Sequence, residues 1–404
     1  MDARAKPSAA APAVGQALPH DSAHLHVAGT AAYTDDLPEP RGLLHVAVGM
    51  STAPHARIES MHLDAVRNDP AVAAVFDHTA IAGENNYGPI VHDDPILAAD
   101  LVEYIGQPVF VVAATSVDAA RRAARRGEIR YRALEPVLDP ETAVEKGSFV
   151  LPSETLTRGE PAAALDASSH RLSGRVRCGG QDQFYLEGHI AMALPQEDGT
   201  LHVYSSTQHP DEVQMLVAGA TGRDAKDVTV VCRRMGGAFG GKESQAALVA
   251  CIAALAASVT NKPCKLRLDR DVDMIMTGKR HDFVIDYDVG FDADGRIHGI
   301  DFTLASRCGM SADLSGPVND RAMFHVDNTF FLENVHILSH RCKTNTVSNT
   351  AFRGFGGPQG MFAIEYVIDD IARALGKDPL EVRKANFYGN TPRNVTHYGQ
   401  VVDD

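Results

Sequence analysis

The hydrophobic pattern of the first third of the chain predicts strands that flank a helix. Apolar runs over Leu43–Met50 and Val109–Ala114 predict two strands. A serine then precedes the Ala/Arg-rich segment Val117–Arg126, which predicts a helix, and Glu128–Arg132 predicts a further strand. These elements indicate one unit of mixed helix and strand.

The rest of the chain predicts hairpins and two long helices. His189–Leu194 and Leu201–Ser205 flank a Glu-Asp-Gly turn, and a second hairpin turns at Asp292–Gly295. Helices are expected over Gln245–Ala257 and Gln359–Leu375, each after a glycine cluster. Since helices and strands interleave without a steady β-α rhythm, the predicted fold class is α+β.

Composition divides the chain further. With 404 residues, of which 44% are hydrophobic, the chain has enough apolar material for two or three domains. We expect a flexible tail over residues 1–20, a first domain over 21–137, a Pro- and Glu-rich linker over 138–161 and a second domain over 162–404. The tail lacks the apolar core of a secretory signal.

Charge, hydropathy and cysteine spacing narrow the function classes. A net charge of -14 argues against a nucleic-acid-binding surface. The most apolar run, Ala246–Val259, is shorter than the roughly 20 residues that span a bilayer, so a buried helix is expected and no membrane partner. The cysteines form no Cys-x-x-Cys pair, and reduced thiols in a cytoplasmic protein are expected. They are Cys178, Cys232, Cys251, Cys264, Cys308 and Cys342.

A first glycine-rich segment, Arg234–Glu243, lies between the predicted strand Val228–Cys232 and a helix. Glycines at such a turn let the backbone approach a ligand, and free amides at a helix start favour an anion or an oxo group. The pattern G-x-x-x-x-G-K is also present, but Glu243 stands where a phosphate-binding loop needs Ser or Thr for magnesium. A nucleotide site is therefore disfavoured, and a purely structural turn stays an alternative.

A second glycine-rich segment, Thr350–Gln359, also leads into a predicted helix. It holds two phenylalanines and an arginine between glycines, which suits a planar aromatic ligand stacked on one ring. A tight turn with core phenylalanines is the alternative. Neither glycine-rich segment decides the function by itself.

The sequences of several segments, and their order along the chain, resemble one family. Four of them resemble the large molybdenum subunit of xanthine dehydrogenases, and two resemble the hammerhead domain that precedes the molybdenum domain there. The four are Gly179–Glu187, Gly236–Glu243, Arg321–Asn328 and Ala351–Gln359, and the two are Gly29–Asp36 and Pro54–Ile58. The resemblance implies a hammerhead-like domain over 21–137 and the first part of a molybdenum-cofactor-binding α+β domain over 162–404, truncated at its C-terminus.

The resemblance also implies a cofactor and its contacts. In the family, molybdenum is held by a pterin dithiolene, here expected as dioxothiomolybdenum-molybdopterin, and not by side chains. Gln208 resembles the glutamine whose amide bonds a molybdenum-bound oxygen. The backbone of Phe239 and Gly240 is expected to line the same atom, and Arg353 to approach it through its main chain.

Substrate contacts follow by the same resemblance. Glu243 and Arg321 resemble the residues that bind opposite ends of a purine, and Phe355 resembles the ring that stacks on it. This implies oxidation of hypoxanthine to xanthine and of xanthine to urate with oxygen from water. Aldehyde oxidases as a group lack this pair, but an aldehyde or N-heterocycle hydroxylase and an inactive fragment stay open.

The same resemblance places part of the chemistry elsewhere. The general-base glutamate is expected beyond Asp404, so no catalytic residue is assigned within the chain. Since the chain has no cysteine framework and no G-x-G-x-x-G sequence, 2Fe-2S clusters and FAD are expected on a partner chain. A hetero-oligomer with that iron–sulfur/FAD subunit is the expected assembly.

Overall fold

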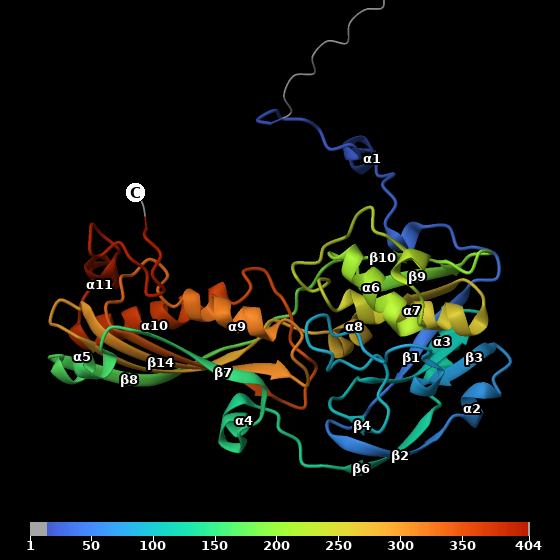
Figure 1. Ribbon diagram of the computed structural model, residues 1–404, viewed down its shortest axis with the longest axis horizontal. Helices are drawn as coiled ribbons and strands as arrows, with labels where there is room; N and C mark the ends of the chain where they lie inside the picture. The colour runs from blue at the N-terminus through green and yellow to red at the C-terminus, as the bar shows by residue number, and fades with distance from the viewer. Residues whose placement is uncertain (1–13, 403–404) are drawn as a thin grey trace, which may run out of the picture.

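The computed structural model describes residues 14–402 and shows two lobes (Figure 1). One lobe contains a seven-stranded and a three-stranded sheet, and the other a five-stranded sheet. Strands and helices are mixed in both, so the predicted α+β class is confirmed. Of the expected tail, residues 1–13 lie outside the described residues.

The sheets are ordered as follows. The seven-stranded sheet runs β11 (Val228–Val231), β10 (Leu201–Ser205), β9 (Ile190–Pro195), β12 (Cys264–Arg267), β1 (Leu44–Met50), β5 (Pro108–Ala114) and β3 (Val72–Asp77). The three-stranded sheet runs β4 (Leu101–Val102), β2 (Ala56–His62) and β6 (Glu128–Ala133). The five-stranded sheet runs β7 (Phe149–Arg158), β15 (Val335–Lys343), β14 (Ile297–Gly309), β13 (Phe283–Phe291) and β8 (His170–Cys178).

The helices connect and cover these sheets. They are α1 (Ala23–Val27), α2 (Asp64–Arg67), α3 (Val117–Ala124), α4 (Pro140–Lys146), α5 (Pro161–Ala167), α6 (Pro210–Thr221), α7 (Ala246–Thr260), α8 (Arg270–Met276), α9 (Ser315–Phe324), α10 (Gly357–Leu375) and α11 (Pro379–Asn386). Short 3-10 helices lie at Thr34–Asp36, His78–Ala80 and Ala225–Asp227.

Strand β5 is buried on both faces. Val111 and Ala113 belong to the hydrophobic core that contains α7, whereas Phe110 and Val112 belong to the core that contains α3. A strand covered on both sides needs apolar residues at every position, which explains the unbroken run at Val109–Ala114. The predicted strand–helix sequence is confirmed, and Ser116 caps α3 by accepting a hydrogen bond from the backbone N–H of Ala119.

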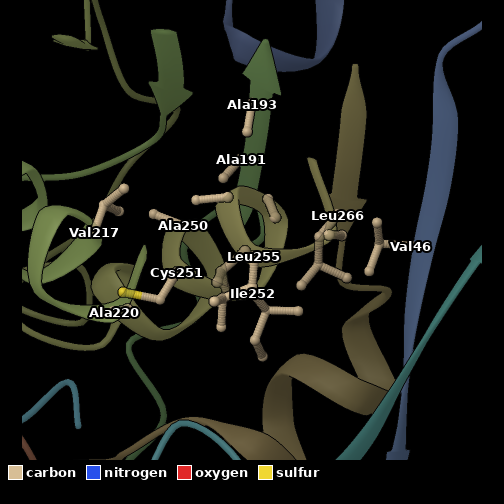
Figure 2. Close-up of a cluster of buried hydrophobic side chains, with 14 of the residues drawn as sticks. Val46, Ala191, Ala193, Val217, Ala220, Ala250, Cys251, Ile252, Leu255 and Leu266 are labelled. Carbon is tan, nitrogen blue, oxygen red and sulfur yellow. The ribbon is translucent and has the colours of Figure 1, made fainter. Parts of the chain in front are cut away.

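Helix α7 lies in the centre of the larger core (Figure 2). All residues from Ala246 to Ala257 are buried, and small side chains such as Ala250 face Ala191 and Ala193 of β9 at close range. The prediction of a buried helix is confirmed. Within residues 14–402, no helix is both long enough and apolar enough to cross a membrane.

The segment expected as a linker, residues 138–161, is not an extended connection. Pro140 begins α4, capped by Asp139, and Gly147 ends it in a left-handed conformation. Strand β7 then pairs antiparallel with β15 at the edge of the five-stranded sheet. Proline is common in linkers, but it is also favoured at the first position of a helix, and Pro140 occupies that position in α4.

The two expected domains share a sheet. Strand β1 pairs in parallel with β12, with Leu44 opposite Cys264. Residues expected in the first domain therefore extend the sheet of the second. The division at residues 137 and 162 stays a prediction.

Candidate functional site

Parallel pairing of β10 and β11 brings Gln208 to the first glycine turn, residues 236–243. Both strands end at the same edge of the sheet, where Gln208 follows β10 and the turn follows β11. The carboxyl ends of neighbouring parallel strands are a common place for ligands in mixed folds. The backbone N–H of Gln208 donates to the Lys242 carbonyl at 2.9 Å, which fixes this neighbourhood.

The side-chain amide of Gln208 has a defined orientation. Its Oε1 accepts from the backbone N–H of Gly240 at 2.9 Å and from that of Lys242 at 3.4 Å. Two N–H donors require the oxygen, not the nitrogen, at this position. Nε2 is therefore on the side away from the turn, and because Gln208 is exposed, its N–H groups are accessible from solvent.

The second glycine turn, residues 351–357, lies directly against the first. The Arg353 N–H donates to the Phe239 carbonyl at 2.9 Å. Gly240 has a φ of 99°, and a Cβ added there would lie 2.8 Å from the Ala351 backbone. Only glycine permits this approach, because other residues would be strained and would collide. Gln208, Phe239, Gly240 and Arg353 are thus brought together.

Two phenylalanines of these turns adopt left-handed backbone conformations. Phe239 has a φ of 54° and Phe355 a φ of 52°. Phe239 is 49% exposed, and an exposed large aromatic ring in a strained turn is typical of a binding surface. Phe352, in contrast, is covered by Arg280, whose guanidinium carbon lies 3.7 Å from the ring centre.

Glu243 is half-buried at the end of the first turn and makes no side-chain hydrogen bond or ion pair within residues 14–402. Burial raises the pKa of its carboxyl, the Asp313 carboxylate raises it further, and His209 opposes both. Asp313 is itself buried and accepts from Ser244 and Gln245. A carboxyl that keeps its proton to higher pH donates as well as accepts hydrogen bonds.

Arg321 lies on α9 and is exposed. Helix α9 packs against the second turn so closely that a Cβ on Gly356 would lie 2.0 Å from the Val318 carbonyl oxygen. Arg321 and Phe355 therefore belong to contacting segments. Within residues 14–402, no hydrogen bond or ion pair joins Arg321 to Glu243.

Sequence reasoning missed the residues that hold the turns from behind. Gln183 donates to the Ala351 carbonyl at 2.9 Å. The Lys242 ammonium is fully buried and donates to the Glu187 carbonyl at 2.7 Å and to Ser206 at 2.8 Å. A lysine within a glycine-rich turn was a usable signal, because a buried cation needs partners nearby.

The sequence matches two described families. Residues 144–387 match the molybdopterin cofactor-binding domain, and residues 28–135 match the a/b hammerhead domain of aldehyde oxidase and xanthine dehydrogenase. Together these matches cover most of the chain.

Individual relatives agree with these matches. A xanthine dehydrogenase of Drosophila subobscura is 43% identical over 96% of this chain, and a nicotinate hydroxylase of Emericella nidulans is 39% identical over 97%. The chain spans 29% of the length of each of these relatives. The solved aldehyde oxidoreductase from Desulfovibrio gigas matches 95% of this chain and 44% of its own, with a TM-score of 0.87 and 26% identity.

Proposed function

The chain belongs to the aldehyde oxidase and xanthine dehydrogenase family, and from this premise we propose that it is part of an enzyme that oxidises hypoxanthine to xanthine and xanthine to urate. The oxygen comes from water. The chain contributes the hammerhead domain and residues of the molybdopterin cofactor-binding domain. Its relatives include xanthine dehydrogenases of insects and plants, which supports the purine substrate.

The residues present fit a molybdenum–pterin group. Gln208 offers an exposed amide N–H whose orientation is set by two backbone donors. The backbone of Phe239, Gly240 and Arg353 comes together beside it, because Gly240 has no Cβ that would collide with the Ala351 backbone. We propose that these four residues hold the group, Gln208 through its side chain and the others through their main chain.

The bound group supplies the centre that accepts two electrons from the substrate. The chain's residues would position the reactants: Gln208 would donate a hydrogen bond to the group, and Phe355 would stack on the purine. Arg321 would face the carbonyl oxygen on which negative charge develops during attack at a purine ring carbon. It stabilises the transition state more than the ground state.

The observation that best supports a purine substrate concerns the surroundings of the Glu243 and Arg321 side chains. Each lies beside the glycine turns, and neither side chain has a hydrogen-bond partner within residues 14–402. Glu243 is half-buried, and a half-buried polar group without a partner is expected where a ligand supplies one. Arg321 is exposed and accessible to the same ligand. A purine has polar atoms at both ends, so it can pair with both side chains.

Oxidation of another N-heterocycle or of an aldehyde is the second candidate. The fungal relative is a nicotinate hydroxylase, and the solved structure is that of an aldehyde oxidoreductase. An aldehyde gives Arg321 no distant carbonyl to stabilise. A fragment that folds without activity is a third candidate, which a molybdenum and pterin analysis of the chain tests.

We further propose a hetero-oligomer in the cytoplasm. The relatives are much longer than this chain, which supports additional domains in the working enzyme. An iron–sulfur/FAD subunit then holds the 2Fe-2S clusters and FAD that receive the electrons. The general-base glutamate is proposed to lie outside residues 1–404.

The test compares two substrates in the assembled enzyme. Removing one partner of a desolvated charged hydrogen bond costs about 2–5 kcal/mol, or roughly 30-fold to several thousand-fold in kcat/KM. Arg321→Met and Glu243→Ala are expected to lower kcat/KM for xanthine by this factor and to spare an aromatic aldehyde. Arg373→Met, which removes an exposed arginine of α10, is the control.

An equal loss for both substrates in both variants would contradict the proposal, because the two residues would then support the pocket without reading the purine. Unchanged kcat/KM for xanthine would contradict it as well. In either case the aldehyde or N-heterocycle hydroxylase becomes the better assignment.

A further inference from the structure

A buried Tyr–Asp–His cluster lies behind the first glycine turn. The Tyr185 hydroxyl lies 2.6 Å from an oxygen of the Asp273 carboxylate and 2.8 Å from Nδ1 of His189. The same Nδ1 lies 3.2 Å from Asp273, and Nε2 of His189 lies 3.1 Å from the Gly241 carbonyl. The side chains of His189 and Asp273 are 0% and 2% exposed, so water does not replace these partners.

The donors and acceptors of this cluster can be assigned. Although burial raises the pKa of Asp273, the charge of His189 and the hydrogen bonds from His189 and Tyr185 bring it below its ordinary value. Asp273 is therefore an acceptor, and the one hydroxyl proton of Tyr185 is donated to it. The Gly241 carbonyl also only accepts. Nε2 of His189 faces this carbonyl, so it donates its hydrogen to it.

The buried His189 ring stands at the start of a chain of hydrogen bonds that ends at Gln208. The carbonyl that His189 contacts belongs to the peptide between Gly241 and Lys242. The N–H of the same peptide donates to Oε1 of Gln208 at 3.4 Å. Hydrogen bonds in such a chain polarise one another.

We propose that His189, held by Asp273 and Tyr185, is a positioning residue for Gln208. It fixes and polarises the Gly241–Lys242 peptide, which in turn orients the Gln208 amide and makes its Nε2–H groups stronger donors to an oxygen of the bound group. The last step rests on the proposed function. The chain of hydrogen bonds up to Gln208 does not.

The buried side chain of Lys242 makes the peptide the adjustable part of this arrangement. Its ammonium is held by Glu187 and Ser206, and it lies 4.8 Å from the centre of the Tyr185 ring. The Lys242 carbonyl is held by the backbone N–H of Gln208. Lys242 is thus held both at its ammonium and at its carbonyl. The contact between His189 and the Gly241 carbonyl then sets the orientation of the Gly241–Lys242 peptide.

The first experiment needs no variant. Nitrogen NMR of the whole chain with ¹⁵N-labelled histidine is expected to show a hydrogen on Nε2 of His189. An Nε2 without a hydrogen would overturn the proposal, because the Gly241 carbonyl would then lack its donor.

The second experiment follows the signal to Gln208. His189→Gln removes the ring that Asp273 and Tyr185 hold against the Gly241 carbonyl, and it is expected to move the Lys242 amide and the Gln208 side-chain amide proton resonances upfield. Tyr185→Phe keeps the His189 ring and is expected to move them less. His202→Gln, on the strand that leads to Gln208, is the matched control. Unmoved Gln208 resonances in a folded His189→Gln chain would overturn the proposal.

The third experiment measures molybdenum and pterin per chain after production in a host that makes the cofactor. Loss of a supporting contact of this kind lowers affinity about 10- to 100-fold, so His189→Gln is expected to retain correspondingly less of both, and His202→Gln as much as wild type. Equal retention by His189→Gln and wild type would overturn the effect on binding. A wild-type chain without molybdenum would contradict the proposed function instead, while the resonances still test the network.

Discussion

At the scale of single residues, the site depends on atoms whose hydrogen bonds are already assigned by their neighbours. Gln208 shows this most clearly, because two backbone N–H groups occupy its Oε1 and leave Nε2 to a ligand. A buried pair shows the opposite case. Asp273 and His189 find all their partners inside the protein, in each other, in Tyr185 and in the Gly241 carbonyl, and they contribute to stability and to the position of the turn.

Replacing Gln208 with Ala or Glu separates these roles. Glu keeps the acceptor for Gly240 but removes the Nε2 donor and adds a negative charge, so this variant is expected to fold within about 0.5 kcal/mol of wild type. Ala also leaves the Gly240 N–H without its acceptor and is expected to be the less stable of the two. Both are expected to retain molybdenum about 10- to 100-fold more weakly. Thermal unfolding and molybdenum analysis check this, and full retention by Gln208→Glu would remove the amide N–H from the site.

Replacing Asp273 with Ala leaves the buried Tyr185 hydroxyl and the His189 backbone N–H without their acceptor. Leaving buried donors without an acceptor costs about 1–3 kcal/mol, which urea unfolding measures. Since the pKa of Asp273 lies below its ordinary value of 3.8, this stability is present above pH 3.8 and is lost as the pH falls further. Asp271→Ala, at an exposed position of the same helix, is the control. Equal stability of the two variants would contradict the prediction.

At the scale of elements, close backbone contact decides how the two glycine turns meet. Each follows a strand and leads into a helix, and the two meet through backbone atoms. Gly240 lies against Ala351, and the Phe239 carbonyl accepts from Arg353. These contacts hold the two turns together.

Gly240→Ala tests this contact. A φ of 99° strains alanine, which costs about 1–3 kcal/mol, and the added Cβ would lie 2.8 Å from the Ala351 backbone. We expect lower stability together with loss of molybdenum. Gly219→Ala in α6 is the matched control: it has open space around it, and alanine is the better helix former by about 0.8–1 kcal/mol. If both variants keep wild-type stability and metal content, the turns do not need glycine.

At the scale of the whole molecule, buried carboxylates join the two lobes. Asp94 accepts from Ser311 at 2.5 Å, and Asp93 accepts from the backbone N–H of Ala312 at 2.9 Å. Burial, with the Asp313 carboxylate adding to it, raises the pKa of Asp94 well above its ordinary value. The contact between the lobes therefore favours the protonated carboxyl.

Asp94→Asn is expected to change how stability depends on pH. A carboxyl with a raised pKa in the fold lowers stability progressively as the pH rises above its ordinary value of 3.8. Asn accepts from Ser311 without ionising. The stability of Asp94→Asn relative to wild type is therefore expected to grow between pH 4 and pH 8, the two ends of the tested range. Unfolding temperatures across this range are the measurement, with exposed Asp118→Asn as the control. A constant difference between Asp94→Asn and wild type would contradict the prediction.

The sequence by itself determined what depends on neighbouring residues. The β5–α3 segment, the hairpin at Asp292–Gly295 and the buried helix α7 follow from apolar periodicity, capping and turn residues, and the structure contains each of them. The glycine turns were identified for the same reason, because their conformations belong to the segment itself. The sequences of these turns also predicted the family.

Only the tertiary structure decided which distant segments meet. No local pattern pairs β1 with β12 or turns the expected linker at 138–161 into an edge strand, since sheet partners depend on packing over the whole chain. The His189–Asp273–Tyr185 cluster was likewise invisible, because its members come from separate segments and acquire their roles through burial. Water solvates a charged side chain wherever it lies on the surface, whereas in a dry interior the same side chain needs a specific partner.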